Sequence, residues 1–263
     1  MLAVVAAVGA MCIATPSHAA NFFAERVVAV SPGSPNQPGF LDPTAALGGP
    51  SGALVGNAST NVYNLGVGGS LTLGFDGQKA ITDGPGPDFI VFENPLFAGG
   101  NPNAVFAELA FVEVSSNGLD FARFPTVSLT PSAVPAFGTL NPANVSGFAG
   151  VNPVAANVND PTSPSPFDPA EAGGDAFDLA DLADDPLVLA GQLDLSAVRF
   201  VRMIDVLGDG TLTDSAGRPI FDPTGPGNGG ADIDGLAVLN GVVPEPATLA
   251  AVLLPAALLR RRR

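Results

Sequence analysis

The chain has 263 residues and a formal net charge of −15, so it repels nucleic acid and we expect no nucleic-acid partner. Only 13% of its residues are charged, while 32 Gly and 26 Pro punctuate runs of Val, Phe, Leu and Thr. This composition predicts an all-β chain with many turns, in one large domain or two small ones.

The N-terminus resembles an export signal. An apolar run is followed by small residues at Ser17 and Ala19, which predicts a signal peptide over residues 1–19. Its removal would also remove the only Cys, Cys12, and the only His, His18. The mature chain would then lack thiols and imidazoles, which excludes Cys-His and Ser-His-Asp catalysis and metal sites built on those groups.

Strand patterns run through the body in chain order. Residues 68–77 alternate, with Leu71, Leu73 and Phe75 on one face, as in a half-buried strand. Residues 88–94 are apolar on both faces, as in a central strand. The sequence also predicts a β-hairpin with a Ser-Asn-Gly turn, and two later strands. These three elements cover residues 108–124, 195–208 and 233–241.

The remaining segments predict loops and one short helix. Residues 31–57 and 131–170 are rich in Pro, Gly and Asn and are expected to form long surface loops. A helix is expected at 175–185, with Asp175 as its N-cap and with leucines of its apolar face turned inward. Those leucines are Leu179 and Leu182. The pattern predicts a single antiparallel β-sandwich of jelly-roll type over residues 20–240.

The C-terminal segment, residues 241–263, has three parts. A Pro-Glu-Pro triplet precedes an apolar run of 13 residues, which is shorter than the roughly 20 residues that span a bilayer. Four arginines follow and would stay on the cytoplasmic side. The order of these parts resembles the PEP-CTERM sorting signal of bacteria. The residues that carry the resemblance are Pro244, Glu245, Pro246, Arg260, Arg261, Arg262 and Arg263.

The resemblance implies processing by an exosortase, a membrane transpeptidase. It also implies delivery to the cell surface or extracellular matrix, with a membrane tether before the tail is processed. A plain C-terminal membrane anchor is the alternative.

A second resemblance concerns the body. The hairpin sequence VEVSSNGLDFARF at 112–124 resembles a hairpin of discoidin-like and related carbohydrate-binding jelly rolls, and AVRFVRMID at 197–205 fits the strand that pairs near it. The ordered series of motifs over residues 61–240 is similar to a family of uncharacterised cell-surface proteins that commonly carry this sorting tail. This resemblance implies a fold and a location, and no activity.

Acidic residues beside glycines gather near the predicted strand ends. Calcium takes six to eight oxygen ligands, which carboxylates and loop carbonyls provide, so the sequence predicts a Ca²⁺ site. Asp and Gly are also ordinary turn residues, and this alternative stays open. The first candidate ligands are Asp232 and Asp234. The further candidates are Asp83, Asp88, Glu93 and Asp209.

These patterns lead to two hypotheses about function. The first is a non-enzymatic surface or matrix protein that binds exopolysaccharide or surface glycans, or has a structural role among them. The second is an extracellular hydrolase that uses a carboxylate pair, as glycosidases do. Trp is absent and Tyr63 is the only Tyr, so any aromatic platform for a sugar must come from Phe.

Overall fold

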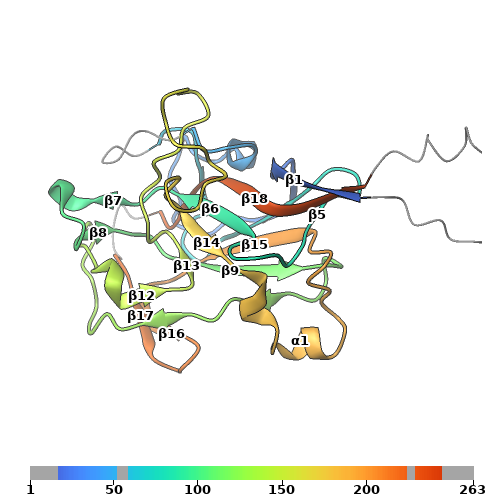
Figure 1. Cartoon of the computed structure of the whole chain (residues 1–263). Helices are drawn as coiled ribbons and strands as arrows, with labels where there is room; N and C mark the ends of the chain where they lie inside the picture. The colour runs from blue at the N-terminus through green and yellow to red at the C-terminus, as the bar shows by residue number, and fades with distance from the viewer. Residues whose placement is uncertain (1–16, 52–58, 224–228, 245–263) are drawn as a thin grey trace, which may run out of the picture.

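The computed structural model describes residues 17–51, 59–223 and 229–244, which form a mostly β protein (Figure 1). The first of two six-stranded antiparallel sheets consists of β1 (Ser17–Phe23), β3 (Tyr63–Asn64), β5 (Ala80–Ile81), β6 (Phe89–Glu93), β14 (Asp175–Phe177) and β18 (Asp232–Pro244). The second consists of β2 (Arg26–Ser31), β4 (Ser70–Gly74), β9 (Ala110–Ser115), β10 (Ala122–Arg123), β13 (Phe148–Ala149) and β15 (Phe200–Asp205).

Three two-stranded ribbons and a few helical turns complete the described chain. The ribbons pair β7 (Leu96–Phe97) with β8 (Val105–Phe106), β11 (Val127–Ser128) with β12 (Val145–Ser146), and β16 (Asp209–Thr213) with β17 (Pro219–Phe221). The helical turns are the 3-10 helices η1 (Pro43–Ala46), η2 (Ala98–Gly100), η3 (Pro142–Asn144) and η4 (Leu179–Leu182), and the four-residue α1 (Pro186–Leu189).

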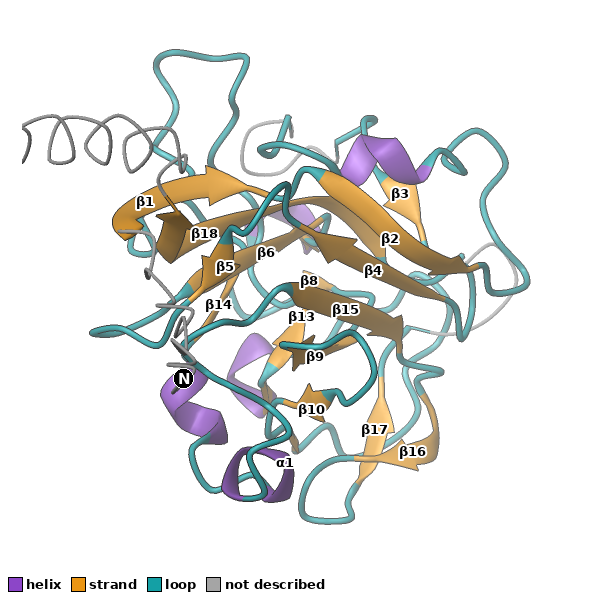
Figure 2. Ribbon diagram, turned by 90° about the vertical axis from the view of Figure 1, so that its right-hand side faces the viewer, coloured by secondary structure: helices purple, strands orange, loops and turns teal. Residues whose placement is uncertain are grey.

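The two large sheets share one hydrophobic core. The first sheet has the strand order β1-β18-β6-β14, and the second has the order β10-β9-β15-β4-β2 (Figure 2). Phe89 and Leu236 of the first sheet belong to the same buried cluster as Leu71, Val112 and Met203 of the second. Each such side chain contributes about 1.5–3 kcal/mol when it is fully buried. The all-β prediction is therefore confirmed, and the arrangement is sandwich-like, while jelly-roll connectivity stays a prediction.

The strand predictions are confirmed. The four single stretches correspond to β4, β6, β15 and β18, and the hairpin corresponds to β9 and β10. Both faces of β6 are buried, as its continuous apolar run indicated. Val201 of β15 lies opposite both Leu73 and Val114, which places buried side chains of three strands in register.

The prediction of one short helix at 175–185 is correct only in part, because the helical turn covers Leu179–Leu182 while the predicted start lies in a strand. Asp175 is no helix cap: it lies buried in β14, where its carboxylate accepts hydrogen bonds from the backbone N–H groups of Gly150 and Val151 at 2.8 and 3.0 Å. Two short helices follow instead, with Asp178 and Asp185 as their caps. The chain breaks between them because a proline disfavours helical geometry in the residue before it. Leu179 and Leu182 are buried as predicted.

The loop predictions are partly wrong. Residues 131–170 contain η3, β12 and β13, and they contribute buried side chains such as Phe148 and Val154 to two apolar clusters. Residues 31–51 are mostly irregular, with η1 as their only helix or strand beyond the end of β2. Pro and Gly predicted irregular backbone there, and their abundance did not distinguish a surface loop from one that is packed.

The two ends of the described chain lie side by side. β1 pairs antiparallel with β18 from Ser17 opposite Pro244 to Phe23 opposite Ala237 (Figure 1). β1 thus begins inside the predicted signal peptide, and cleavage after Ala19 would leave only its second half. Residues 1–16 and 245–263, which hold most of the predicted signal peptide and sorting tail, lie outside the described residues. No described helix is long and apolar enough to cross a membrane.

Candidate ligand-binding pocket

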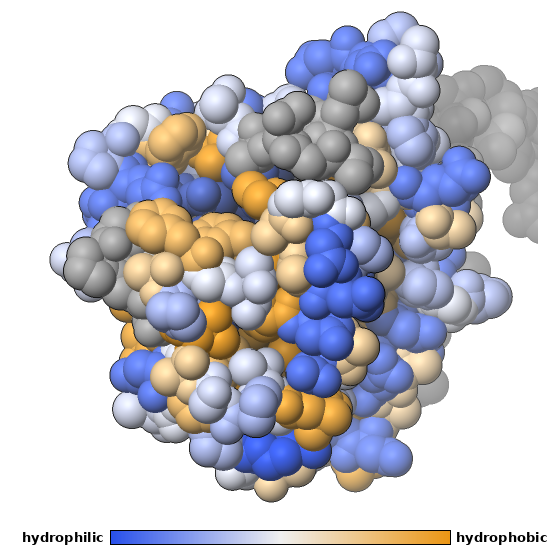
Figure 3. Space-filling model, turned by 90° about the vertical axis from the view of Figure 1, so that its left-hand side faces the viewer, coloured by the Kyte–Doolittle hydropathy of each residue, from blue (hydrophilic) through white to orange (hydrophobic). Residues whose placement is uncertain are grey.

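A pocket of about 360 Å³ opens beside the β7–β8 ribbon. Apolar side chains form part of its wall, among them Leu96, Phe106 and Phe137. Its polar lining consists of Gln37, Asn94, Glu108, Thr139 and Asp232. The ribbon lies on the left of Figure 1, and Figure 3 shows this side of the molecule, on which hydrophobic and hydrophilic residues adjoin one another.

Strand pairing brings two of the predicted acids together. β18 begins at Asp232 beside the end of β6, where Ile233 pairs with Glu93. The backbone N–H of Asp232 donates a hydrogen bond to Glu93 Oε1 at 2.8 Å, and the Asn64 side chain donates to Asp232 Oδ1 at 2.8 Å. Glu93 is 1% exposed and Asp232 is 9% exposed. Both carboxyl groups are therefore held by the sheet rather than by mobile loops.

Three further acids join this pair, and the five residues are here called the acidic cluster. Glu108 precedes β9 and is 7% exposed, while Asp205 ends β15. Asp205 accepts hydrogen bonds from the backbone N–H groups of Gly68 and Ala231, each at 2.8 Å. Asp222 accepts one from the Leu109 N–H at 2.9 Å. The acidic cluster comprises Glu93, Glu108, Asp205, Asp222 and Asp232.

Burial and mutual repulsion raise the pKa values throughout the acidic cluster. Burial raises the pKa of Glu108 to about 9, and the negative charges of Asp232, Asp205 and Asp222 add to this effect. Burial and the charge of Glu108 also raise the pKa of Glu93 well above its ordinary value. The pKa is raised by burial to about 7 for Asp205 and to about 6 for Asp232. The groups of the pocket therefore hold protons that ordinary carboxyl groups release.

No basic side chain forms an ion pair with the acidic cluster within the described ranges. The ion pairs found there join Lys79 to Glu25, Arg123 and Arg202 to Glu113, and Arg218 to Asp214. Two buried oxygens of the cluster, Glu93 Oε2 and Glu108 Oε1, have no hydrogen-bond partner among the described residues. A buried polar group without a partner costs about 1–3 kcal/mol or more. The pocket thus presents acceptors that a ligand can satisfy.

Phe137 stands out on the pocket wall. Its backbone has φ 57°, and it is the one residue other than glycine with positive φ in the part of the chain that the structure describes. Such strain costs on the order of 1–3 kcal/mol and is concentrated at functional sites. The side chain is 69% exposed and its ring stacks on Phe106, with ring centroids 6.3 Å apart. The strained loop thus displays an aromatic face to solvent at the pocket.

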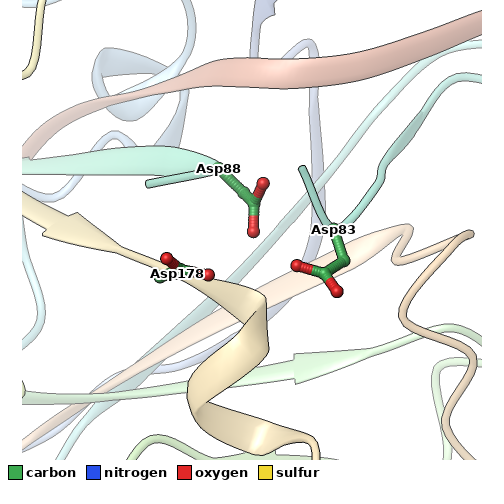
Figure 4. Close-up of side chains that lie close together, drawn as sticks. All are labelled: Asp83, Asp88 and Asp178. Atoms are coloured by element: carbon green, nitrogen blue, oxygen red, sulfur yellow. The ribbon is translucent and has the colours of Figure 1, made fainter. Parts of the chain in front are cut away.

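A second group of acids lies at the opposite end of β6. Asp83, Asp88 and Asp178 each offer one oxygen, and these oxygens all lie within 4.8 Å of one another (Figure 4). Asp88 is also a structural tie, because it accepts hydrogen bonds from the Gly84 N–H, the Asn240 side chain and the Leu179 N–H. The predicted set of Asp83, Asp88 and Glu93 is therefore divided between the two ends of one strand.

The other predicted metal ligands have partners of their own. Asp234 is buried, and its Oδ1 accepts a hydrogen bond from the Ser51 N–H at 3.1 Å. Asp209 is exposed at the start of β16 and accepts hydrogen bonds from the N–H and hydroxyl of Thr211. Among the residues of the sorting motif, only Pro244 lies within the described ranges.

Sequence reasoning missed Glu108, Asp205 and Asp222 as members of one cluster. Each adjoins an apolar stretch, at the start of LAFVEV, at the end of FVRMI, and after PIF. An acid at the border of a buried strand is a weak signal, and the packing of the sheet that holds β18 against the sheet that holds β9 and β15 is needed to bring these positions together.

Comparison with protein-family models and with curated proteins finds no match for this chain, so its function has to be inferred from the chemistry of the pocket.

Proposed function

We propose that this is an exported cell-surface or extracellular-matrix protein that binds a glycan in the pocket beside β7 and β8. The predicted export signal and the resemblance of the tail to a PEP-CTERM signal support the location. An exosortase is the partner that would process the tail, and exopolysaccharide or surface glycans are the ligands within reach of a protein placed there.

The observation that carries the binding proposal is the exposed, strained Phe137, which lines the same pocket as two buried carboxyl groups. Sugars combine an apolar ring face with hydroxyl groups around its edge. The Phe137 ring offers a stacking surface, Gln37 and Asn94 offer amides, and Glu108 and Asp232 accept hydrogen bonds from hydroxyl groups. A volume of about 360 Å³ falls within the range of roughly 300–1,000 Å³ typical of small-molecule sites.

Binding of the full chain to an array of bacterial and plant glycans tests this proposal. Phe137→Ala should weaken binding about tenfold, because an aromatic contact contributes roughly 0.5–1.5 kcal/mol beyond the area that it buries. Leu189→Ala is the matched control, since Leu189 is 72% exposed and Phe137 is 69% exposed, and Leu189 does not line the pocket. Equal affinity of both variants for every bound glycan would contradict the proposal.

A hydrolase is the second candidate, and one observation favours it. Glu108 and Asp232 line the same pocket, with pKa values raised by burial to about 9 and about 6. A protonated carboxyl group near an ionised one is the arrangement that glycosidases use as acid and base or nucleophile. Release of new reducing ends from a bound polysaccharide, lost in Glu108→Gln, would favour the hydrolase. Binding without any release supports the non-enzymatic role.

A further inference from the structure

We propose that the pocket selects glycans that carry a positively charged amine, such as hexosamines without their N-acetyl group. This inference rests on the proposed glycan-binding function and names the ligand class of the same site. Three features of the pocket support it. The rings of Phe106 and Phe137 form an aromatic wall, and the buried acids Glu108 and Asp232 form what is here called the acidic floor. One carboxyl oxygen of Glu108 has no hydrogen-bond partner among the described residues.

The charge of the floor is the first argument. Glu108 and Asp232 line the pocket, and the carboxyl group of Glu93 accepts a hydrogen bond from the backbone N–H of Asp232. None of the ion pairs found among the described residues involves them. Burial keeps protons on these carboxyl groups in the free protein, and a neutral hydroxyl group leaves them there. An ammonium group favours the ionised form of a neighbouring carboxyl group, so that it satisfies the acceptors and pairs with the charge through hydrogen bonds roughly twice as strong as neutral ones.

The position of the unpartnered oxygens is the second argument. Glu108 is 7% exposed, belongs to the pocket lining, and has no partner for Oε1 among the described residues. Glu93 is 1% exposed and its Oε2 likewise has no partner there. The aromatic wall adds to the preference, because the faces of Phe106 and Phe137 attract cations.

The spacing of the carboxylates distinguishes an ammonium from a bare metal ion. Calcium binds oxygens at about 2.3–2.6 Å, so oxygens on one ion lie within about 5 Å of one another. In the described parts of the chain, one set of three acids meets a limit of 4.8 Å, and it consists of Asp83, Asp88 and Asp178, outside the pocket. An ammonium donates hydrogen bonds of about 2.7–2.9 Å and therefore reaches oxygens that are farther apart.

Calorimetric titration of the full chain with two tetrasaccharides tests the inference. The first is a β-linked glucosamine tetramer with free amines, and the second is the same tetramer fully N-acetylated. Both are titrated at neutral pH, because a mildly acidic solution would hold the pocket carboxyl groups in their protonated form. We expect the amine form to bind about tenfold more tightly or better, which corresponds to one additional charge-assisted hydrogen bond. Spermine serves as the control for positive charge without a sugar.

Two variants each replace one glutamate by glutamine, the first in the pocket and the second on the surface outside it. Glu108→Gln should abolish most of the preference for the amine form. Glu171→Gln should leave it intact, because Glu171 is exposed and does not line the pocket. Melting curves of both variants check that they fold, and the comparison of the two tetramers on the unmodified chain does not depend on either variant.

The outcomes separate this inference from the proposed function. Equal affinity for the two tetramers, or a tighter N-acetylated form, would overturn the amine preference and leave glycan binding in place. Spermine binding as tightly as the amine tetramer, or equal losses in both variants, would also overturn it, because net charge alone would then explain the result. If neither tetramer nor any other glycan binds, both the inference and the proposed function fail.

Discussion

Glu93 accepts a hydrogen bond from the backbone N–H of Asp232 through one carboxylate oxygen, while its second oxygen is buried without a partner among the described residues. The two residues are 139 positions apart in the chain and meet only because β6 pairs with β18. Burial and the neighbouring acids therefore disfavour the ionised form of Glu93.

Glu93→Gln should stabilise the protein. The amide oxygen can still accept the Asp232 N–H, while the repulsion from neighbouring carboxylates is removed. We expect a gain in the free energy of unfolding of about 1–3 kcal/mol at neutral pH, measured by urea denaturation.

Glu113→Gln is the matched control for that substitution. Glu113 is also buried, but it forms ion pairs with Arg123 and Arg202, whose guanidinium groups lie over the rings of Phe111 and Phe121. The same chemical change should therefore destabilise the fold by about 1–3 kcal/mol. A change of the same sign in both variants would contradict the description of Glu93.

Stability should fall as the pH rises from about 5 to about 8. Burial raises the pKa of Asp175 from 3.8 to about 7 and that of Glu108 from 4.5 to about 9. Between its unfolded and folded pKa, each group binds more protons in the folded state, so folding is favoured at low pH and loses this contribution as the pH rises. Each pKa unit corresponds to about 1.4 kcal/mol, which makes the loss several kcal/mol.

Urea denaturation across this pH range provides the measurement. Asp175→Asn should flatten the profile, whereas Asp160→Asn should leave it unchanged. Asp160 is exposed, and its hydrogen bonds with Thr162 lower its pKa, so it titrates only below this range. A profile of the unmodified protein that rises with pH would show that the buried acids are ionised without penalty.

Calcium binding stays a prediction from the sequence. Among the described carboxylates, those of Asp83, Asp88 and Asp178 approach one another closely enough for one ion. If Ca²⁺ binds there, it should raise the melting temperature relative to chelator through preferential binding to the folded state, and Mg²⁺ should raise it less. Asp83→Asn should remove the gain, and Asp209→Asn should preserve it. Coincident melting curves in calcium and chelator would end this prediction.

The sorting prediction can be tested without disturbing the sheet. β18 ends at Pro244, so Glu245→Ala combined with Pro246→Ala changes the motif beyond the last described strand residue. We expect export to continue and unprocessed protein to accumulate in the membrane, as detected by immunoblots of cell fractions. Normal processing and arrival at the surface would contradict the role of an exosortase.

The sequence predicted the parts of this molecule that depend on local order. The alternation of Leu71, Leu73 and Phe75 marked β4, because each apolar side chain of a half-buried strand recurs at every second position. The start of the predicted helix at 175–185 was wrong, because the spacing of its leucines says nothing about the long-range partners of Asp175. Asp175 finds backbone donors at Gly150 and Val151, and this long-range contact favours a strand.

Most of the candidate site could not be predicted from local sequence patterns. Asp232 and Glu93 were identified as acids near strand ends, but Glu108 precedes a strand of the other large sheet and reaches them only through the packing of the two sheets. Phe137 shows the same limit, because nothing in the sequence PAFGTL indicates that its backbone adopts positive φ. The acidic composition of the chain was visible in the sequence, but the position of the pocket depends on contacts between residues that are distant in the chain.

The length of β18 has a consequence for a chain held by its tail. The strand runs for 13 residues from Asp232, in the pocket, to Pro244, beside the start of β1. At about 3.3 Å per residue, it separates the two by up to roughly 40 Å. If the tail were embedded in a membrane, the Pro244 end of β18 would lie near the lipid, and the pocket at the Asp232 end would lie away from it. The same strand that supplies an acid to the pocket would set how far from the lipid surface a polymer is captured.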